Sequence, residues 1–167
     1  ALGIVGGAIP KGKASSPITQ NVLIEADGEQ IKLKGTNLSA TISVWIDSIG
    51  TTPGQVLVPH KQLSDLVGSF PRDKVELELK DSSLSIVCGK SKAKLRVADV
   101  SEFPIASEVK ATKTILVESK TLKDGFAVSF ATASAERAEL SGVKIAIDKG
   151  RIEFAATDGY KLAIQEL

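Results

Sequence analysis

The strongest constraint on the fold of this chain is an internal repeat. Shifting the sequence by 59 positions lays residues 56–70 on residues 115–129, and shifting it by 121 lays residues 22–36 on residues 143–157. The smaller shift matches Leu57 with Leu116, Val58 with Val117, Lys61 with Lys120, Leu63 with Leu122 and Asp65 with Asp124. The larger shift matches Val22 with Val143, Ile24 with Ile145, Asp27 with Asp148, Ile31 with Ile152 and Thr36 with Thr157. Because the larger shift is about twice the smaller, we infer a half-unit of about 60 residues that is doubled into a domain.

Each half-unit has the order strand, helix and three strands. A helix is predicted from about residue 60, because Leu63, Leu66, Val67 and Phe70 form one apolar stripe before Pro71. Alternating apolar and polar residues predict the strands, which are separated by turns. In the next half-unit we expect a strand at residues 114–117, a helix at 121–131, strands at 143–147 and 152–154, and a last strand from residue 160 to the end.

The half-units imply a fold class. A lone amphipathic helix on a small sheet exposes apolar surface, so two half-units must pack together. We therefore predict an α+β fold in which each domain has two helices on antiparallel sheets. The alternation stops at residues 98–112, which contain Pro104 and predict an interdomain linker. The expected parts are a first domain at residues 1–97, the linker, and the first half of a second domain at residues 113–167.

The composition narrows the class of function. The chain has one cysteine and one histidine, which exclude an internal disulfide framework and a histidine cluster for a metal. Cys88 alternates with Leu84 and Ile86, so we expect a buried, inert thiol. No apolar run reaches the length of a membrane span and the N-terminus has no basic leader. We expect a cytoplasmic protein without a metal or cofactor.

Several runs of residues are characteristic of one family. Residues 31–38 read Ile-Lys-Leu-Lys-Gly-Thr-Asn-Leu, residues 101–104 read Ser-Glu-Phe-Pro, and residues 156–163 read Ala-Thr-Asp-Gly-Tyr-Lys-Leu-Ala. These runs, with the hairpin at residues 21–28, resemble the bacterial DNA sliding clamps, the beta subunit of DNA polymerase III. The resemblance extends over essentially the whole chain, and the run at residues 156–163 is its most specific part.

The resemblance implies a fold and a function. Clamps of this family have three domains per subunit and close into a homodimeric ring with helices around the hole. We therefore expect the DNA-clamp fold and a DNA replication processivity factor that encircles duplex DNA. By comparison with the family, the first strand and part of the first helix of domain one are expected before Ala1. The resemblance also implies a non-enzyme. The net charge of +1 is compatible with it, because encirclement does not depend on a strongly basic surface.

The resemblance also suggests residues that face DNA. Lys13 and Arg137 match loop positions at which the family approaches the duplex. Lys61, Lys120 and Lys123 lie at or near helix starts. Lysine and arginine at such points would contact phosphates without reading the base sequence. The alternative is that these side chains are simply solvated.

A second site is implied for partner proteins. In the family, the polymerase, the clamp loader and repair proteins insert short peptides into an apolar pocket, of which domain two forms one side. The matching residues here are Leu140, Thr157, Gly159, Tyr160, Lys161 and Leu162. Tyr160 stands where many relatives have histidine. The alternative is that these residues only close a strand and a core.

Two other functions stay open at this point. One is a protein-interaction module or decoy derived from the clamp fold, which neither encircles DNA nor assists a polymerase. The other is an unrelated β-rich hydrolase. The only pairing that a Cys-His dyad could use is His60 with Cys88, on a helix start and a buried strand.

Overall fold

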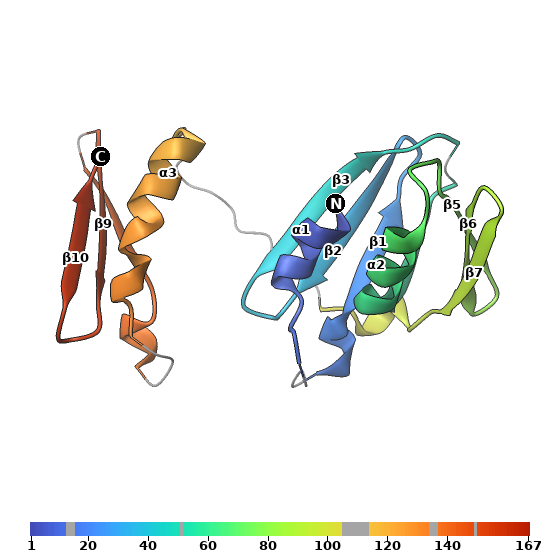
Figure 1. The fold of residues 1–167 in the computed structure, drawn as a ribbon, viewed down its shortest axis with the longest axis horizontal. Coiled ribbons are helices and arrows are strands. Elements are labelled where there is room, and N and C mark those ends of the chain that lie inside the picture. Colours follow the sequence, from blue (N-terminus) through green and yellow to red (C-terminus); the bar gives the residue numbers. More distant parts are fainter. Residues whose placement is uncertain (13–15, 51, 105–113, 134–136, 149) are drawn as a thin grey trace. The chain divides into compact units, whose positions relative to one another are not determined.

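The computed structural model describes residues 1–12, 16–50, 52–104, 114–133, 137–148 and 150–167. The chain divides into two compact units, Ala1–Glu108 and Val109–Leu167. Figure 1 shows both units. Each unit is described by itself below.

The first unit contains a four-stranded antiparallel sheet. Its strands are β1 (Asn21–Ala26), β2 (Gln30–Thr36), β3 (Thr41–Asp47) and β4 (Gly54–Pro59), in the order β3-β2-β1-β4. The alternation in the sequence sets the register, because Ile24 lies opposite both Leu33 and Val56 and all three side chains are buried. Strand β4 belongs to the second half-unit and pairs with β1 of the first half-unit. The sheet therefore contains strands of both half-units.

Two short helices cover one face of this sheet. Helix α1 (Leu2–Val5) and helix α2 (His60–Ser69) lie side by side across it (Figure 1). Leu63 of α2 is buried, and Leu66, Val67 and Phe70 pack around the same core, as the apolar stripe predicts. That core brings both half-units together.

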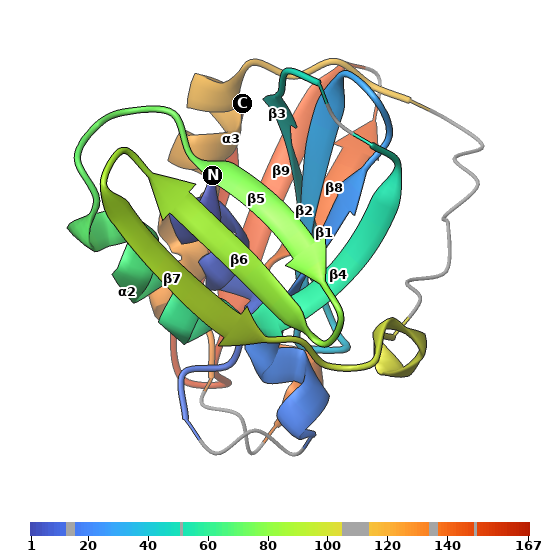
Figure 2. The same ribbon diagram turned by 90° about the vertical axis from the view of Figure 1, so that its right-hand side faces the viewer.

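A second sheet has three strands. It consists of β5 (Glu76–Lys80), β6 (Ser83–Cys88) and β7 (Ser91–Arg96), in that order, and it faces the viewer in Figure 2. Leu84, Ile86 and Cys88 alternate inward along β6 and are buried. The prediction that Cys88 is buried is thereby confirmed. Its thiol lies 3.7 Å from the carbonyl oxygen of Pro71.

The start of the predicted linker packs on the first unit. Ala98 donates a backbone hydrogen bond of 2.8 Å to Leu57, and Phe103 packs against Leu23 and Leu57. Between them, Asp99 accepts hydrogen bonds from the Ser101 hydroxyl and amide, which hold the pKa of the Asp99 carboxyl below its ordinary value. Residues 105–112 of the predicted linker lie outside the described residues.

The second unit repeats half of the first. Helix α3 (Ser119–Gly125) continues as a 3-10 helix (Phe126–Ala131), and a further 3-10 turn spans Ala138–Leu140. The strands β8 (Lys144–Asp148), β9 (Arg151–Thr157) and β10 (Leu162–Glu166) form a sheet in the order β10-β9-β8. Its small core contains Val128, Ala131, Phe154 and Ala156.

Two predictions in this unit need correction. Residues 114–117, predicted as a strand, have no regular structure, and Leu116 is fully exposed. A strand is stable only beside a neighbour, and the described strands of this unit pair only among themselves. The helix predicted at residues 121–131 starts earlier, at Ser119, and becomes a 3-10 helix from Phe126.

Candidate functional site

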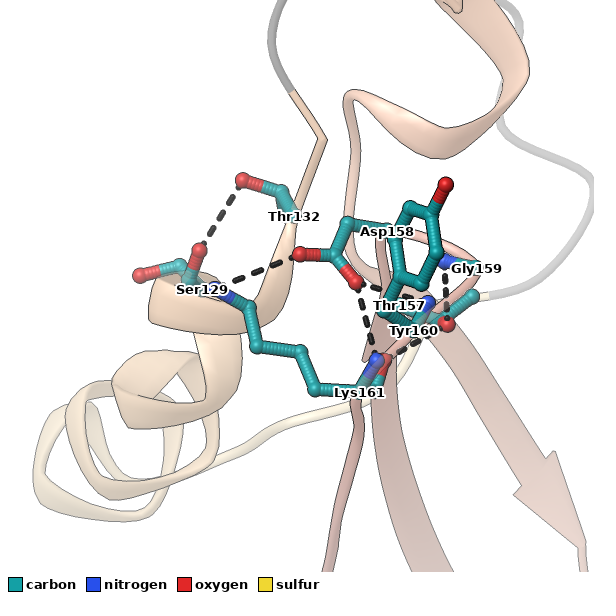
Figure 3. Close-up of polar contacts among 7 residues, drawn as sticks. All are labelled: Ser129, Thr132, Thr157, Asp158, Gly159, Tyr160 and Lys161. Carbon is teal, nitrogen blue, oxygen red and sulfur yellow. Dashed lines mark hydrogen bonds and ion pairs between the residues drawn. The ribbon is translucent and has the colours of Figure 1, made fainter.

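The residues with the most specific sequence pattern form the tight turn between β9 and β10. Thr157 is the last residue of β9 and Leu162, directly opposite it, is the first residue of β10. The Thr157 hydroxyl donates 2.7 Å to the Lys161 carbonyl and accepts 3.1 Å from the Gly159 amide (Figure 3). One side chain thus fixes both ends of the turn.

Asp158 ties the other half of the same turn. Its Oδ1 accepts hydrogen bonds from the amides of Lys161 at 2.9 Å and Tyr160 at 3.0 Å, and its Oδ2 lies 3.3 Å from Lys161 Nζ. These bonds, the one from the Lys161 amide first, hold the pKa of the Asp158 carboxyl below its ordinary value. The Asp158 carboxylate therefore has a structural role in the turn.

The turn presents its remaining side chains to solvent. Gly159 has a φ of 92°, a conformation that side-chain-bearing residues rarely adopt. Tyr160 is fully exposed, and Leu162 is two-thirds exposed. In Figure 3 no hydrogen bond reaches the Tyr160 ring. Exposed aromatic and aliphatic side chains beside a rigid turn are suited to contact another molecule.

A hollow of about 510 Å³ lies beside this turn and brings Leu140, Thr157 and Leu162 together. Leu140 is held there because its carbonyl accepts a 3.0 Å hydrogen bond from the Ala133 amide. Val143, Ala155 and Ala156 add to the apolar lining. Three of the six predicted pocket residues thus line one hollow, and Gly159, Tyr160 and Lys161 form the adjacent turn.

The structure adds a cation to this site. Arg137 Nη1 lies 3.6 Å from the position that a Cβ on Gly159 would occupy. The sequence suggested Arg137 only as a DNA-facing residue, and its distance from Gly159 along the chain gave no sign of this proximity. Ala155 was also missed, although it lies two residues before Thr157 on β9 and so faces the same side of the sheet.

The predicted DNA-facing residues lie on different structural elements of the two units. Lys61 is the second residue of α2, and Lys120 is the second residue of α3, in agreement with the repeat. Lys61, Lys120 and Lys123 are exposed, as is Arg137. Lys13 lies outside the described residues. The exposure of the four described residues is compatible with contact to a polyanion and equally with solvation.

A second hollow, of about 400 Å³, contains none of the predicted residues. It is lined by Ala146, Asp148, Arg151, Glu153 and Glu166 of the small sheet. Four of its five lining residues are charged, whereas the hollow beside the β9–β10 turn is lined mainly by apolar residues and is therefore the better candidate for binding a peptide. Over the described part of the chain, no helix is long and apolar enough to cross a membrane.

Comparison with known proteins decides the family. The family model for the N-terminal domain of the DNA polymerase III beta subunit matches residues 1–107. The chain belongs to the DNA polymerase III beta subunit family. The resemblance inferred from the sequence motifs is thereby confirmed.

Its relatives in this family are named beta sliding clamps. The Synechococcus elongatus clamp is 30% identical over 169 residues, which are 98% of this chain and 45% of the relative. The Pseudomonas aeruginosa clamp is 28% identical over 171 residues, 99% of this chain and 46% of the relative. The chain thus spans about half the length of the sliding clamps that it matches.

Solved structures of beta subunits share the fold. The crystal structure of the Pseudomonas aeruginosa DNA polymerase III subunit beta has a TM-score of 0.93 and 26% identity, and the match covers 99% of this chain and 46% of that one. The Caulobacter crescentus pol III beta has a TM-score of 0.92 and 28% identity, with 100% and 47% covered. The predicted α+β clamp fold is confirmed.

Proposed function

We propose that this chain acts as part of a DNA replication processivity factor, a sliding clamp that encircles duplex DNA and tethers a replicative polymerase. The observation that carries the proposal is the beta-subunit match over residues 1–107, together with relatives named sliding clamps over nearly the whole chain. The role is non-catalytic and belongs in the bacterial cytoplasm, where the DNA lies. A homodimeric ring would provide the closed structure that encirclement of the duplex requires.

We propose that the hollow beside the β9–β10 turn receives partner peptides from the polymerase, the clamp loader and repair proteins. Leu140 and Leu162 supply apolar walls. The lack of a side chain on Gly159 lets a peptide backbone approach, and Arg137 and Lys161 supply cations near a carbonyl or an acidic side chain. Tyr160 adds an aromatic surface at the rim.

We propose that DNA contacts are made by lysines on the helices, with Lys61 and Lys120 in equivalent positions of successive half-units. Their contacts would be to phosphates and independent of base sequence. Lys13, Lys123 and Arg137 belong to the same proposal. Because the ring supplies the hold on DNA, each contact needs to add little affinity.

A hybrid subunit tests the tethering function. The 167 residues replace the matching segment of the Pseudomonas aeruginosa clamp, and primer extension by that organism's replicative polymerase is measured. We expect the hybrid to lengthen the products of single binding events. Leu162→Asp should shorten them at least tenfold, because it places a charge in the apolar hollow. The matched control is Ile164→Asp, two residues along the same strand, exposed and outside the hollow.

Two results of this experiment would count against the proposal. A folded hybrid that leaves product length unchanged would favour the interaction module that does not assist a polymerase. Equal losses of product length from Leu162→Asp and Ile164→Asp would contradict the hollow as the polymerase contact. They would not contradict the clamp function.

A further inference from the structure

The hollow beside the β9–β10 turn has a counterpart region in the first unit. There a 3-10 turn (Pro17–Gln20) precedes β1, as the 3-10 turn Ala138–Leu140 precedes β8 in the second unit. The repeat shift of 121 positions lays residues 17–23 on residues 138–144, all of which line the hollow. The two regions can therefore be compared position by position.

In the first unit this region holds a segment of the chain itself. Ile18 and Leu23 pack in one apolar cluster with Phe103, and Leu23 and Phe103 are both buried. The hydrogen bond from the Ala98 amide to the Leu57 carbonyl ties the start of the same segment to β4. In the first unit the region is thus an apolar receptor for an aromatic side chain.

The second unit carries charges at the same two positions. Glu139 takes the position of Ile18, and Lys144 takes that of Leu23. Both side chains are exposed where they line the hollow. Within the part of the chain that the structure describes, neither takes part in an ion pair. An aromatic side chain placed here would remove water from both charges without replacing its hydrogen bonds, which is unfavourable.

We propose that Glu139 and Lys144 select the partner peptides that the hollow accepts. The selected peptides carry an acidic residue that pairs with Lys144 and a basic residue that pairs with Glu139. Both residues lie near the apolar residue that contacts Leu140 and Leu162. Peptides with an aromatic residue or a like charge at these positions are rejected. The inference rests on the proposed peptide site and adds the chemistry of its partners.

Charge complementarity favours a separate peptide over the chain's own docking segment. Residues 98–104 contain two acidic residues and Phe103 but no basic residue. They therefore offer Glu139 no partner and bring an aromatic ring to a charged position. A peptide with both signs of charge matches the two positions.

A peptide library presented to the intact 167-residue chain tests this selection. The peptides have one fixed leucine and random neighbouring positions, and they are displayed in many copies on phage so that weak binding is retained. We expect an acidic and a basic residue to be enriched at two separate positions near the leucine, by about three- to fivefold each, as for exposed ion pairs. Leu162→Asp should abolish the leucine-dependent binding if the peptides use the hollow.

Two double variants test the assigned residues. In Glu139→Lys with Lys144→Glu, the enriched acidic and basic positions should exchange, because each peptide residue follows its partner. In Glu139→Ile with Lys144→Leu, which introduces the residues of the first unit, an aromatic residue should be enriched instead. The matched control is Arg151→Glu, exposed on β9 and outside the hollow, which should leave the selection unchanged.

Three results would overturn the inference. Binding that depends on Leu162 but shows no charge preference would do so, as would a preference that the double variants leave unchanged, and both would leave the peptide site intact. An altered selection in Arg151→Glu would assign the preference to the net charge of the unit. A chain that retains no leucine-dependent peptide would overturn the peptide site and the inference together.

Discussion

Gly125 of α3 and Phe154 of β9 approach so closely that a side chain on Gly125 is sterically excluded. A Cβ at that position would lie 2.3 Å from Phe154 Cε2. Phe154 is fully buried and stacks edge-on against Phe126, with their ring centroids 5.5 Å apart. The glycine therefore lets the helix rest on the sheet that carries the candidate pocket, since Phe154 lies three residues before Thr157 on the same strand.

Gly125→Ala should destabilise the second unit by about 1–3 kcal/mol, because the added methyl group overpacks Phe154. The matched control is Gly142→Ala in the same unit, where the new Cβ meets no atom within 4 Å and the effect should stay within about 0.5 kcal/mol. Hydrogen exchange of residues 151–157 measures the difference. Equal effects of the two substitutions would contradict the assigned contact.

In the first unit, Gly6→Ala should loosen the contact between the two helices. A Cβ on Gly6 would lie 2.7 Å from His60 Cε1, and the ring would have to move away from the Leu2 carbonyl that its Nε2 contacts at 3.0 Å. We expect a loss of about 1–2 kcal/mol in thermal unfolding. Gly3→Ala, in helix α1 directly before Gly6 and with open space around it, should be neutral or stabilising. Destabilisation by Gly3→Ala of the same size would assign the loss to the helix itself.

The β9–β10 turn should loosen in acid. Because the pKa of Asp158 in the folded turn is below the ordinary 3.8, its ionised form stabilises the turn at every pH above that value. This contribution is lost as the pH falls through the lowered pKa. The amide shifts of Tyr160 and Lys161 in NMR should therefore titrate with a midpoint below 3.8. Asp158→Asn should abolish the titration while keeping the amide bonds, because Oδ1 remains an acceptor. A midpoint above 3.8 would contradict this.

Lys61 and Lys120 should contribute to binding duplex DNA through phosphates alone. Replacing either lysine by alanine should reduce the slope of log binding constant against log salt by about 0.9 per phosphate contact removed. Affinity should fall equally on unrelated DNA sequences. Lys92→Ala on the exposed strand β7 is the control and should leave the slope unchanged. An unchanged slope for both helix lysines would leave them as solvated side chains.

Much of the first unit could be predicted from the sequence because its pattern and its packing agree. The stripe from Leu63 to Phe70 predicts α2, and the alternation through Val22 and Ile24 predicts β1. The prediction that β1 buries one face is wrong at Leu23, which is buried on the other face against Phe103. Residues 115–117 repeat the consecutive apolar residues Val56-Leu57-Val58 of β4 but form no strand. The apolar pattern of a sequence indicates a possible strand, but the strand forms only where a neighbouring strand satisfies its backbone hydrogen bonds.

The candidate site was predictable where its residues are consecutive along the chain. Thr157 to Leu162 form one turn, so their proximity follows from their order. Arg137 lies close to Gly159 although the two residues are far apart in the sequence, and no local sequence pattern predicts that proximity. Ala155 is an intermediate case, since the two-residue period of β9 places it on the side of Thr157.

Retention on DNA is the most direct test of the proposed clamp function. The hybrid of this chain with the Pseudomonas aeruginosa clamp is loaded onto nicked circular duplex DNA, and its half-life there is measured at a salt concentration that dissociates simple phosphate contacts. We expect the hybrid to stay on the circle and to leave at least tenfold faster once the DNA is cut, with the Pseudomonas aeruginosa clamp measured in parallel as the control. A folded hybrid that leaves circular and linear DNA at the same rate would contradict encirclement.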